Sequence, residues 1–226
     1  MIIALFDADG TLYTAQFGRG LMKYSSEHDR RFFAWRYYAR ILPAYTLYKL
    51  KLGNRENMQY ALLAHLSGML QGLNEAQASA ALTWLLHDYL LPTQRADVMK
   101  RLKDHQAKGH KVIIVSGMLT RCAELFKEHL GIEAAIGTEP EFKNGSYTGQ
   151  TVPPAISGTV KVDKIRELVS SRGWDVDWAA SYAYGDSFAD RYMLELVGHP
   201  VAVYPDAKLH KQAMEKNWEV LGTPKE

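Results

Sequence analysis

Two aspartates spaced by one residue follow a short apolar run near the N-terminus of the chain. The apolar residues 2–6 run directly into Asp7 and Asp9. Gly10 and Thr11 follow the second aspartate. A short apolar run that ends in a turn signal is typical of a strand buried on both faces. Carboxylates are costly to bury there without a partner, so the stretch indicates a metal cation, a catalytic role, or both.

Other polar residues follow later strands in the same way. Ser116 comes after the apolar run 112–115, and Asp186 follows a strand predicted at 181–184. Parallel strands of an open sheet end at one edge, where such sheets bind their ligands. The sequence therefore predicts that Asp7, Ser116 and Asp186 meet at that edge. Each stretch read alone also fits a plain turn or a helix cap.

Strands and helices alternate along most of the chain, and these elements must position the polar residues. Strands are predicted at residues 2–6, 111–117, 132–136, 181–184 and 200–204. Helices are predicted at residues 94–108, 120–129, 160–172, 187–197 and 207–217. This alternation is typical of an α/β fold with a parallel sheet and right-handed crossovers. An Asn-Gly pair within residues 142–147 indicates a β-hairpin.

Residues 15–91 differ in character from the rest of the chain. They are rich in long aromatic and basic side chains and have few short β-branched runs, which indicates helices. The strand predicted before this segment and those after it belong together in one sheet. We therefore predict a helical cap domain at 15–91, inserted into a core domain made of residues 1–14 and 92–226.

The helices of the predicted cap have recognisable limits. One helix is predicted within residues 25–52, where Pro43 should end or kink it. A second is predicted at 55–70. A third, at 74–90, opens with Asn74 and Gln77 at the spacing of a capping box.

Composition narrows the class of protein. The chain has 226 residues, 47% of them apolar, enough for one large domain or for a core domain with an insert. A net charge of +2 suggests no nucleic-acid partner. The single cysteine, Cys122, excludes an intrachain disulfide and fits a reducing compartment. With no signal-peptide pattern and no apolar run long enough to span a membrane, we expect a cytoplasmic protein without a membrane partner. The oligomeric state stays open.

Taken in order, the motifs resemble those of the haloacid dehalogenase-like (HAD) hydrolases, subfamily IB, the phosphoserine phosphatase-like branch. Residues 7–11 resemble the DxDGT signature, and Ser116 ends the second motif. Residues 158–161 resemble the GxxK arrangement of that branch, and residues 184–190 resemble GDSxxD. The resemblance implies a Rossmann-like core with a central parallel sheet and an inserted alpha-helical, C1-type cap.

The resemblance also implies roles for the motif residues. Asp7 would be a nucleophile that becomes phosphorylated, and Asp9 a general acid and base. Lys161 would neutralise the phosphoryl oxygens, with Lys164 as its competitor one turn later. Asp190 would orient Lys161 or a metal-bound water. The other expected groups are a phosphate site at Thr11, Ser116, Gly117 and Lys161, and a Mg²⁺ site at Asp7, the backbone carbonyl of Asp9, and Asp186.

These roles predict a Mg²⁺-dependent phosphomonoester hydrolase that acts on a small phosphorylated metabolite through a phosphoaspartyl intermediate. An acid at Asp9 is needed for an alcohol leaving group and is superfluous for halide, so dehalogenation is rejected. A phosphotransferase or phosphomutase with the same nucleophile is one alternative. A catalytically inactive HAD-fold binding protein is the other.

The predicted cap leaves the substrate open. No glutamate follows Thr11 where phosphoserine phosphatases recognise the substrate amine, so phosphoserine is not carried over. The basic, aromatic segment fits a packed cap with solvated Arg and Lys, a recognition surface for an anionic or aromatic substrate, or a contact with a membrane surface. The residues singled out for substrate contact are Tyr13, Arg19, Lys23 and Arg36.

Overall fold

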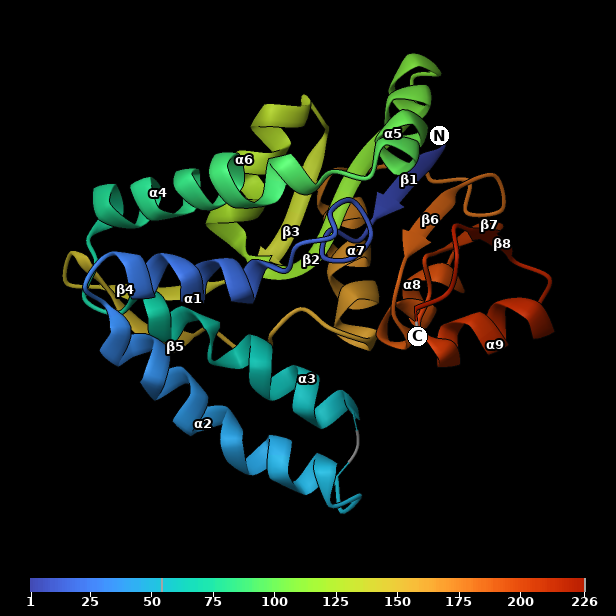
Figure 1. Cartoon of the computed structure of the whole chain (residues 1–226). Helices are drawn as coiled ribbons and strands as arrows, with labels where there is room; N and C mark the ends of the chain where they lie inside the picture. The colour runs from blue at the N-terminus through green and yellow to red at the C-terminus, as the bar shows by residue number, and fades with distance from the viewer. Residues whose placement is uncertain (54, 226) are drawn as a thin grey trace.

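The computed structural model describes residues 1–53 and 55–225, of which Arg55 and Glu56 are described by their backbone alone. Within these residues the centre of the fold is a six-stranded parallel sheet with the order β3-β2-β1-β6-β7-β8 (Figure 1). The strands are β1 Ile3–Phe6, β2 Lys111–Leu119, β3 Ala134–Thr138, β6 Tyr182–Gly185, β7 His199–Val203 and β8 Glu219–Leu221. The predicted α/β class with a parallel sheet is confirmed.

Helices cover both faces of this sheet, because its strands alternate apolar side chains between two clusters. Ala4 and Phe6 belong to one cluster, and Ile3 and Leu5 belong to the other. Helices α5 (Ala96–Ala107) and α6 (Thr120–Leu130) contribute to the first cluster. The second cluster includes residues of α7 (Thr159–Ser171), α8 (Arg191–Leu194) and α9 (Ala207–Glu215).

The segment predicted as a cap is helical throughout most of its length. Its elements are α1 Phe17–Glu27, α2 Arg31–Lys49, α3 Arg55–Ala64, the 3₁₀ helix η1 Leu66–Leu70, α4 Glu75–Trp84, the π-helix η2 Leu85–Leu90 and the 3₁₀ turn η3 Leu91–Thr93. Helices α2 and α3 pack against each other and extend away from the sheet, whereas α4 and η2 pack along α6 (Figure 1). The boundaries at 14/15 and 91/92 stay a prediction.

Two helix limits differ from the sequence expectations. The predicted 25–52 helix is divided, since α1 and α2 are separated at residues 28–30, where Asp29 has a positive φ of 53°. Pro43 does not end its helix, because α2 runs through it to Lys49. Ala39, whose carbonyl has no N–H partner at Pro43, lies on the exposed side of the helix where water can bind it. The capping box at Asn74 and Gln77 is confirmed.

The predicted hairpin is also present. Strands β4 Pro140–Lys143 and β5 Ser146–Thr151 pair antiparallel. Both turn residues, Asn144 and Gly145, have positive φ, at 51° and 79°. Such a turn matches the twist of the two strands, which is why Asn-Gly favours it. Tyr147 of β5 accepts a backbone hydrogen bond from Gly72 and donates one to Leu73, so the hairpin is bound to the cap segment.

Three elements of the core differ from the sequence expectations. Strand β2 continues past Ser116 to Leu119, with a shift of register against β3. The helix predicted at 187–197 is a 3₁₀ turn, η4 Phe188–Asp190, followed by the short α8. Strand β8 was not predicted, because its three residues are a strand only through pairing with β7. None of the helices in the described ranges has the length and apolar character needed to cross a membrane.

Candidate active site

The two strands at the centre of the sheet bring the motif aspartates together. From β1 the chain builds outward through β2 and β3 on one side and through β6, β7 and β8 on the other. Asp7 follows β1, Asp186 follows β6, and the Asp7 amide donates to the carbonyl of Tyr184 at 2.9 Å. Ligands bind open α/β sheets at such a reversal of strand order, outside the carboxyl ends of the strands.

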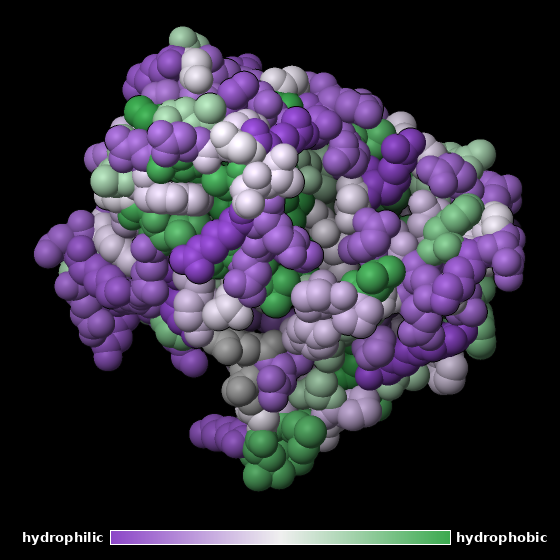
Figure 2. Space-filling model, turned by 180° about the vertical axis from the view of Figure 1, so that it is seen from behind, coloured by the Kyte–Doolittle hydropathy of each residue, from purple (hydrophilic) through white to green (hydrophobic). Residues whose placement is uncertain are grey.

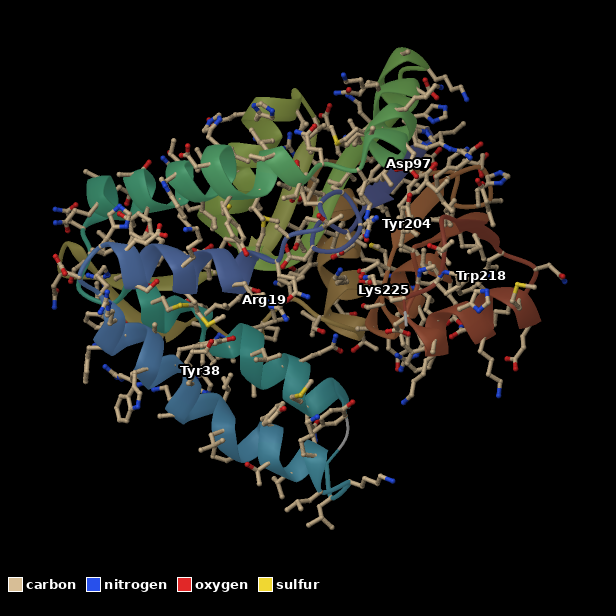
Figure 3. The ribbon with its side chains drawn as sticks, in the orientation of Figure 1. Arg19, Tyr38, Asp97, Tyr204, Trp218 and Lys225 are labelled. Atoms are coloured by element: carbon tan, nitrogen blue, oxygen red, sulfur yellow. The ribbon has the colours of Figure 1, made fainter. Side chains whose placement is uncertain are left out.

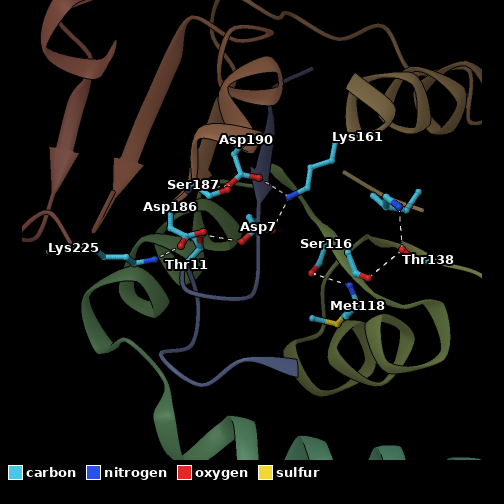
Figure 4. A network of polar contacts seen from close by, with 12 residues as sticks. Asp7, Thr11, Ser116, Met118, Thr138, Lys161, Asp186, Ser187, Asp190 and Lys225 are labelled. Atoms are coloured by element: carbon cyan, nitrogen blue, oxygen red, sulfur yellow. Dashed lines mark hydrogen bonds and ion pairs between the residues drawn. The ribbon is translucent and has the colours of Figure 1, made fainter. Parts of the chain in front are cut away.

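Lys161 joins two of the carboxylates in a buried ion pair network (Figure 4). Its Nζ donates to Asp7 Oδ1 at 2.6 Å and to Asp190 Oδ1 at 2.7 Å. Burial by itself would lower the pKa of Lys161, but the carboxylates of Asp190 and Asp7 raise it above its ordinary value. Burial opposes the charge of Asp190 too, yet Lys161 and Ser187 hold the pKa of Asp190 below its ordinary value. Lys161 and Asp190 are therefore both charged.

The remaining carboxylates, Asp7 and Asp186, would repel one another and Asp190 when ionised. Burial raises the pKa of Asp7 and of Asp186 above the ordinary aspartate value, and the charge of the neighbouring carboxylates adds to this. Oxygens of Asp7, Asp186 and Asp190 all lie within 4.8 Å of one another. A hard divalent cation with oxygen ligands, such as Mg²⁺, fits this donor set and would offset this repulsion. Asp190 was not among the predicted metal ligands, while Asp7 and Asp186 were.

A lysine from the C-terminal segment already offsets part of that repulsion. The Lys225 ammonium donates to Asp186 Oδ2, and the Lys225 amide donates to the Pro205 carbonyl at 2.8 Å (Figure 4). Sequence reasoning did not find Lys225, and nothing in the local sequence marks it.

The Asp9 carboxylate is not part of the cluster of Asp7, Asp186 and Asp190. Its two carboxylate oxygens accept from the Phe17 amide, at 3.2 and 3.1 Å, in the first turn of α1. Burial, and then the charge of Asp7, raises the pKa of Asp9 to about 7. A carboxyl group with that pKa exchanges protons readily near neutral pH, as a general acid and base must.

Of the predicted phosphate ligands, Thr11 and Lys161 contact Asp7. The Thr11 hydroxyl donates to Asp7 Oδ2 at 3.2 Å. The Ser116 hydroxyl accepts from the Met118 amide at 3.3 Å (Figure 4). Ser116, Gly117 and Lys161 line a pocket of about 1000 Å³ together with Asp7, Asp9, Asp186 and Asp190. Thr11 is fully buried behind the carboxylates that its hydroxyl contacts.

Helices of the cap segment form the opposite wall of this pocket. Lining residues come from α1, α2 and α3, and Arg19 is one of them. Arg19 lies near the N-terminal end of α1, on the side that faces α3, whereas Lys225 lies toward the sheet (Figure 3). The pocket is therefore closed on one side by core carboxylates and on the other by the cap helices.

The sequence of this chain is similar to those of known proteins. The profile of the haloacid dehalogenase-like hydrolases matches residues 4–195. The chain belongs to this family. The family predicted from the motifs is thereby confirmed. Relatives named phosphoserine phosphatase confirm the resemblance to that branch.

Curated relatives of this HAD chain include proteins named as phosphatases. It is 30% identical over 222 residues to phosphoserine phosphatase SerB1 of Mycobacterium tuberculosis, covering 96% of this chain and 69% of that protein. It is 32% identical over 185 residues to the inhibition of morphological differentiation protein of Streptomyces azureus, covering 81% of this chain. The chain spans 66% of that Streptomyces protein and 54% of a probable phosphatase of M. tuberculosis.

Solved structures share the fold of this HAD chain. A Bordetella pertussis protein of unknown function superposes with a TM-score of 0.81 at 22% identity, covering 97% of both chains. A phosphoserine phosphatase in apo form superposes with a TM-score of 0.65 at 16% identity, covering 97% of this chain and 92% of that one. These likenesses establish the HAD fold.

Three of the residues singled out for substrate contact do not line the pocket. The Tyr13 ring is buried against Phe126, with ring centroids 4.8 Å apart. Lys23 pairs with Glu27 on the surface of α1. Arg36 donates to Gln71 Oε1, so its guanidinium points toward Gln71, which does not line the pocket. Of the four residues predicted to contact substrate, Arg19 therefore lines the pocket, whereas Tyr13, Lys23 and Arg36 do not.

The choice between Lys161 and Lys164 is decided by the direction of the side chains on α7. Lys164 Nζ donates to Glu167 Oε2 at 2.6 Å on the exposed face of the helix.

Cys122, in the first turn of α6, lies fully buried, and burial raises its thiol pKa. A reactive thiolate, which a position near a helix start can favour, is excluded at Cys122.

Proposed function

We propose that the protein is a Mg²⁺-dependent phosphomonoester hydrolase that acts on a small phosphorylated molecule through a phosphoaspartyl intermediate on Asp7. The observation that carries the proposal is the buried network of Asp7, Lys161 and Asp190 beside Asp186 at the floor of a pocket. The names of its relatives, which include phosphoserine phosphatase and histidinol-phosphatase, support it. A cytoplasmic location is part of the proposal.

The side chains divide the reaction between them. An Asp7 oxygen attacks phosphorus and forms an O–P bond, while the bond from phosphorus to the substrate oxygen breaks. Asp9 gives its proton to that leaving oxygen. Asp9 then takes a proton from water, which attacks the aspartyl-phosphate and releases inorganic phosphate and free Asp7.

The surrounding groups hold the phosphoryl group and its charge. Lys161, Ser116 and the backbone at Gly117 face the pocket beside Asp7 and supply hydrogen bonds to the transferring oxygens. Asp190 fixes the Lys161 ammonium. Mg²⁺ held by Asp7, the Asp9 backbone, Asp186 and Asp190 would reduce the repulsion between a carboxylate nucleophile and a phosphate dianion.

Phosphate release from small phosphomonoesters, including a chromogenic aryl phosphate, tests the proposal. We expect release that needs Mg²⁺, stops with excess chelator and is lost in Asp7→Asn and in Lys161→Met. Lys164→Met is the matched control on the same helix and should keep the activity. Release that persists in Asp7→Asn would contradict the assigned nucleophile, and phosphate found on a second alcohol would indicate a phosphotransferase instead.

A further inference from the structure

The wall of the pocket opposite the carboxylates is apolar. It is formed by side chains of α1, α2 and α3, among them Met22, Ile41, Leu42, Met58, Leu62 and Leu63. A volume of about 1000 Å³ lies at the upper end of the range for ligand pockets. A serine-sized leaving group would leave most of this wall in contact with water.

The polar groups of this wall do not suit an amino-acid substrate. Among its described residues the cap contributes one cation, Arg19, the amides of Gln16 and Gln59, and the hydroxyl groups of Tyr37, Tyr38 and Tyr45, but no carboxylate. The carboxylates of the described lining residues all belong to the core. A substrate ammonium directed at the cap would therefore lie against apolar side chains without a countercharge there, which is unfavourable.

The apolar wall continues out of the pocket along α2. Trp35, Tyr38, Leu42 and Tyr45 line the pocket at a spacing that places them on one face of the helix. They are nevertheless 65%, 55%, 58% and 45% exposed. The expectation of a cap whose aromatic side chains are packed inside it is wrong for these residues.

This exposed face, which we call the α2 strip, is long and narrow. Ten residues of helix correspond to about 15 Å. Near the C-terminal end of α2, Leu47, Leu50 and Leu52 are exposed as well, on other sides of the chain. Figure 2 shows hydrophobic side chains gathered at the lower tip of the molecule, where α2 ends. Apolar surface that a folded protein leaves uncovered in this way is typical of a binding site.

We infer that the substrate is a phosphomonoester whose alcohol carries a long apolar chain, as in a single-chain lipid phosphate. This inference rests on the proposed function, since it places the phosphate at Asp7 and Lys161. Arg19 and Gln59 are then near the polar part of the alcohol, and the chain lies along the α2 strip. An elongated apolar track fits a chain better than a compact polar ring system.

A series of n-alkyl phosphates from butyl to dodecyl, used below their micelle concentrations, tests the inference, with phosphoserine alongside. We expect kcat/KM of the wild type to rise with chain length, by up to about fourfold for each methylene that becomes buried. Leu42→Ser and Trp35→Ser should flatten that rise. Phe32→Ser is the control, because Phe32 is exposed on α2 but does not line the pocket.

Binding of the same series to Asp7→Asn, followed by calorimetry, separates this inference from the proposed function. Affinity that rises with chain length and falls in a Leu42→Ser background supports the apolar track even where hydrolysis is absent. Hydrolysis without chain-length dependence, or faster hydrolysis of phosphoserine, overturns the inference and leaves the phosphatase proposal intact. Equal affinity for butyl and dodecyl phosphate also overturns it. Equal weakening by Phe32→Ser and Leu42→Ser would show general detergent binding and overturn it as well.

Discussion

At the scale of single residues, Lys225 has the clearest consequence for the site. Its ammonium contacts Asp186, one of the carboxylates available to a metal ion. The ammonium also lies close to Gly10, since a Cβ atom added to this glycine would be 2.9 Å from it. Two cations on one carboxylate repel each other, so a metal ion must displace Lys225 from Asp186 or share it at a cost. Lys225 would therefore compete with a metal ion bound at Asp186.

We predict that Lys225→Met raises the affinity for Mg²⁺ by about 1.4- to 5-fold, the range expected for a partly exposed ion pair. Titration calorimetry of Mg²⁺ into the metal-free protein measures this without any substrate. Lys211→Met, whose side chain is 80% exposed and pairs with Glu215, is the control. Unchanged or weaker Mg²⁺ binding in Lys225→Met would contradict the competition.

At the scale of elements, α5 is tied to the sheet beside the site through His105. The His105 Nε2 lies 2.9 Å from the Tyr184 hydroxyl of β6, and its Nδ1 lies 2.8 Å from His110 Nδ1. Burial, and then the nearby cationic side chains and His110, lowers the pKa of His105 to about 4. The folded protein thus holds this imidazole neutral where an unfolded chain would protonate it.

The sign of the pH effect follows from that shift. Between about pH 6.5 and 4 the unfolded chain binds a proton that the folded protein does not, so stability falls as the pH falls through this range. We predict a contribution of up to about 1.4 kcal/mol per pH unit from this one group. In His105→Gln the melting temperature should depend less steeply on pH.

Calorimetric melting between pH 7.5 and 5 measures the difference between the two proteins. The buried carboxylates are the same in both, so their titration cancels. His87→Gln changes an exposed histidine and should run parallel to the wild type. Parallel curves for His105→Gln and wild type would refute the role of His105.

At the scale of the whole molecule, the cap segment and the sheet share an apolar core. Leu82 and Leu85 of the cap segment belong to the same cluster as Ile114 of β2 and Phe126 of α6. Figure 1 shows α4 lying alongside α6, with only α2 and α3 extending away from the body of the protein. We therefore expect the segments 1–14, 15–91 and 92–226 to unfold together.

We predict that Leu82→Ala lowers the free energy of unfolding by about 2–5 kcal/mol, because Leu82 is fully buried. Denaturation should stay a single transition when it is followed by far-ultraviolet circular dichroism and by tryptophan fluorescence. Leu50→Ala, at a site 62% exposed, should change stability by less than about 0.5 kcal/mol. Two separate transitions, of which only one responds to Leu82→Ala, would mean that the cap unfolds independently.

The sequence by itself determined the features that depend on near neighbours in the chain. Asp7, Ser116 and Asp186 could be predicted to lie at one edge of the sheet, because its parallel strands run toward the same edge, and all three line the same pocket although β2 continues to Leu119. The Asn74 capping box and the Asn144-Gly145 turn were predictable because each depends on a few consecutive residues.

Only the tertiary structure decided which side chains share a space. Lys161 and Lys164 lie on one helix, and packing against the sheet turned the first to Asp7 and the second to water. Tyr13 lies in the core, and Lys225 contacts Asp186, from which it is distant in the sequence. The α2 strip was left uncovered, although its composition fits a packed helix equally well. Such outcomes depend on contacts between residues distant in sequence, which local patterns do not encode.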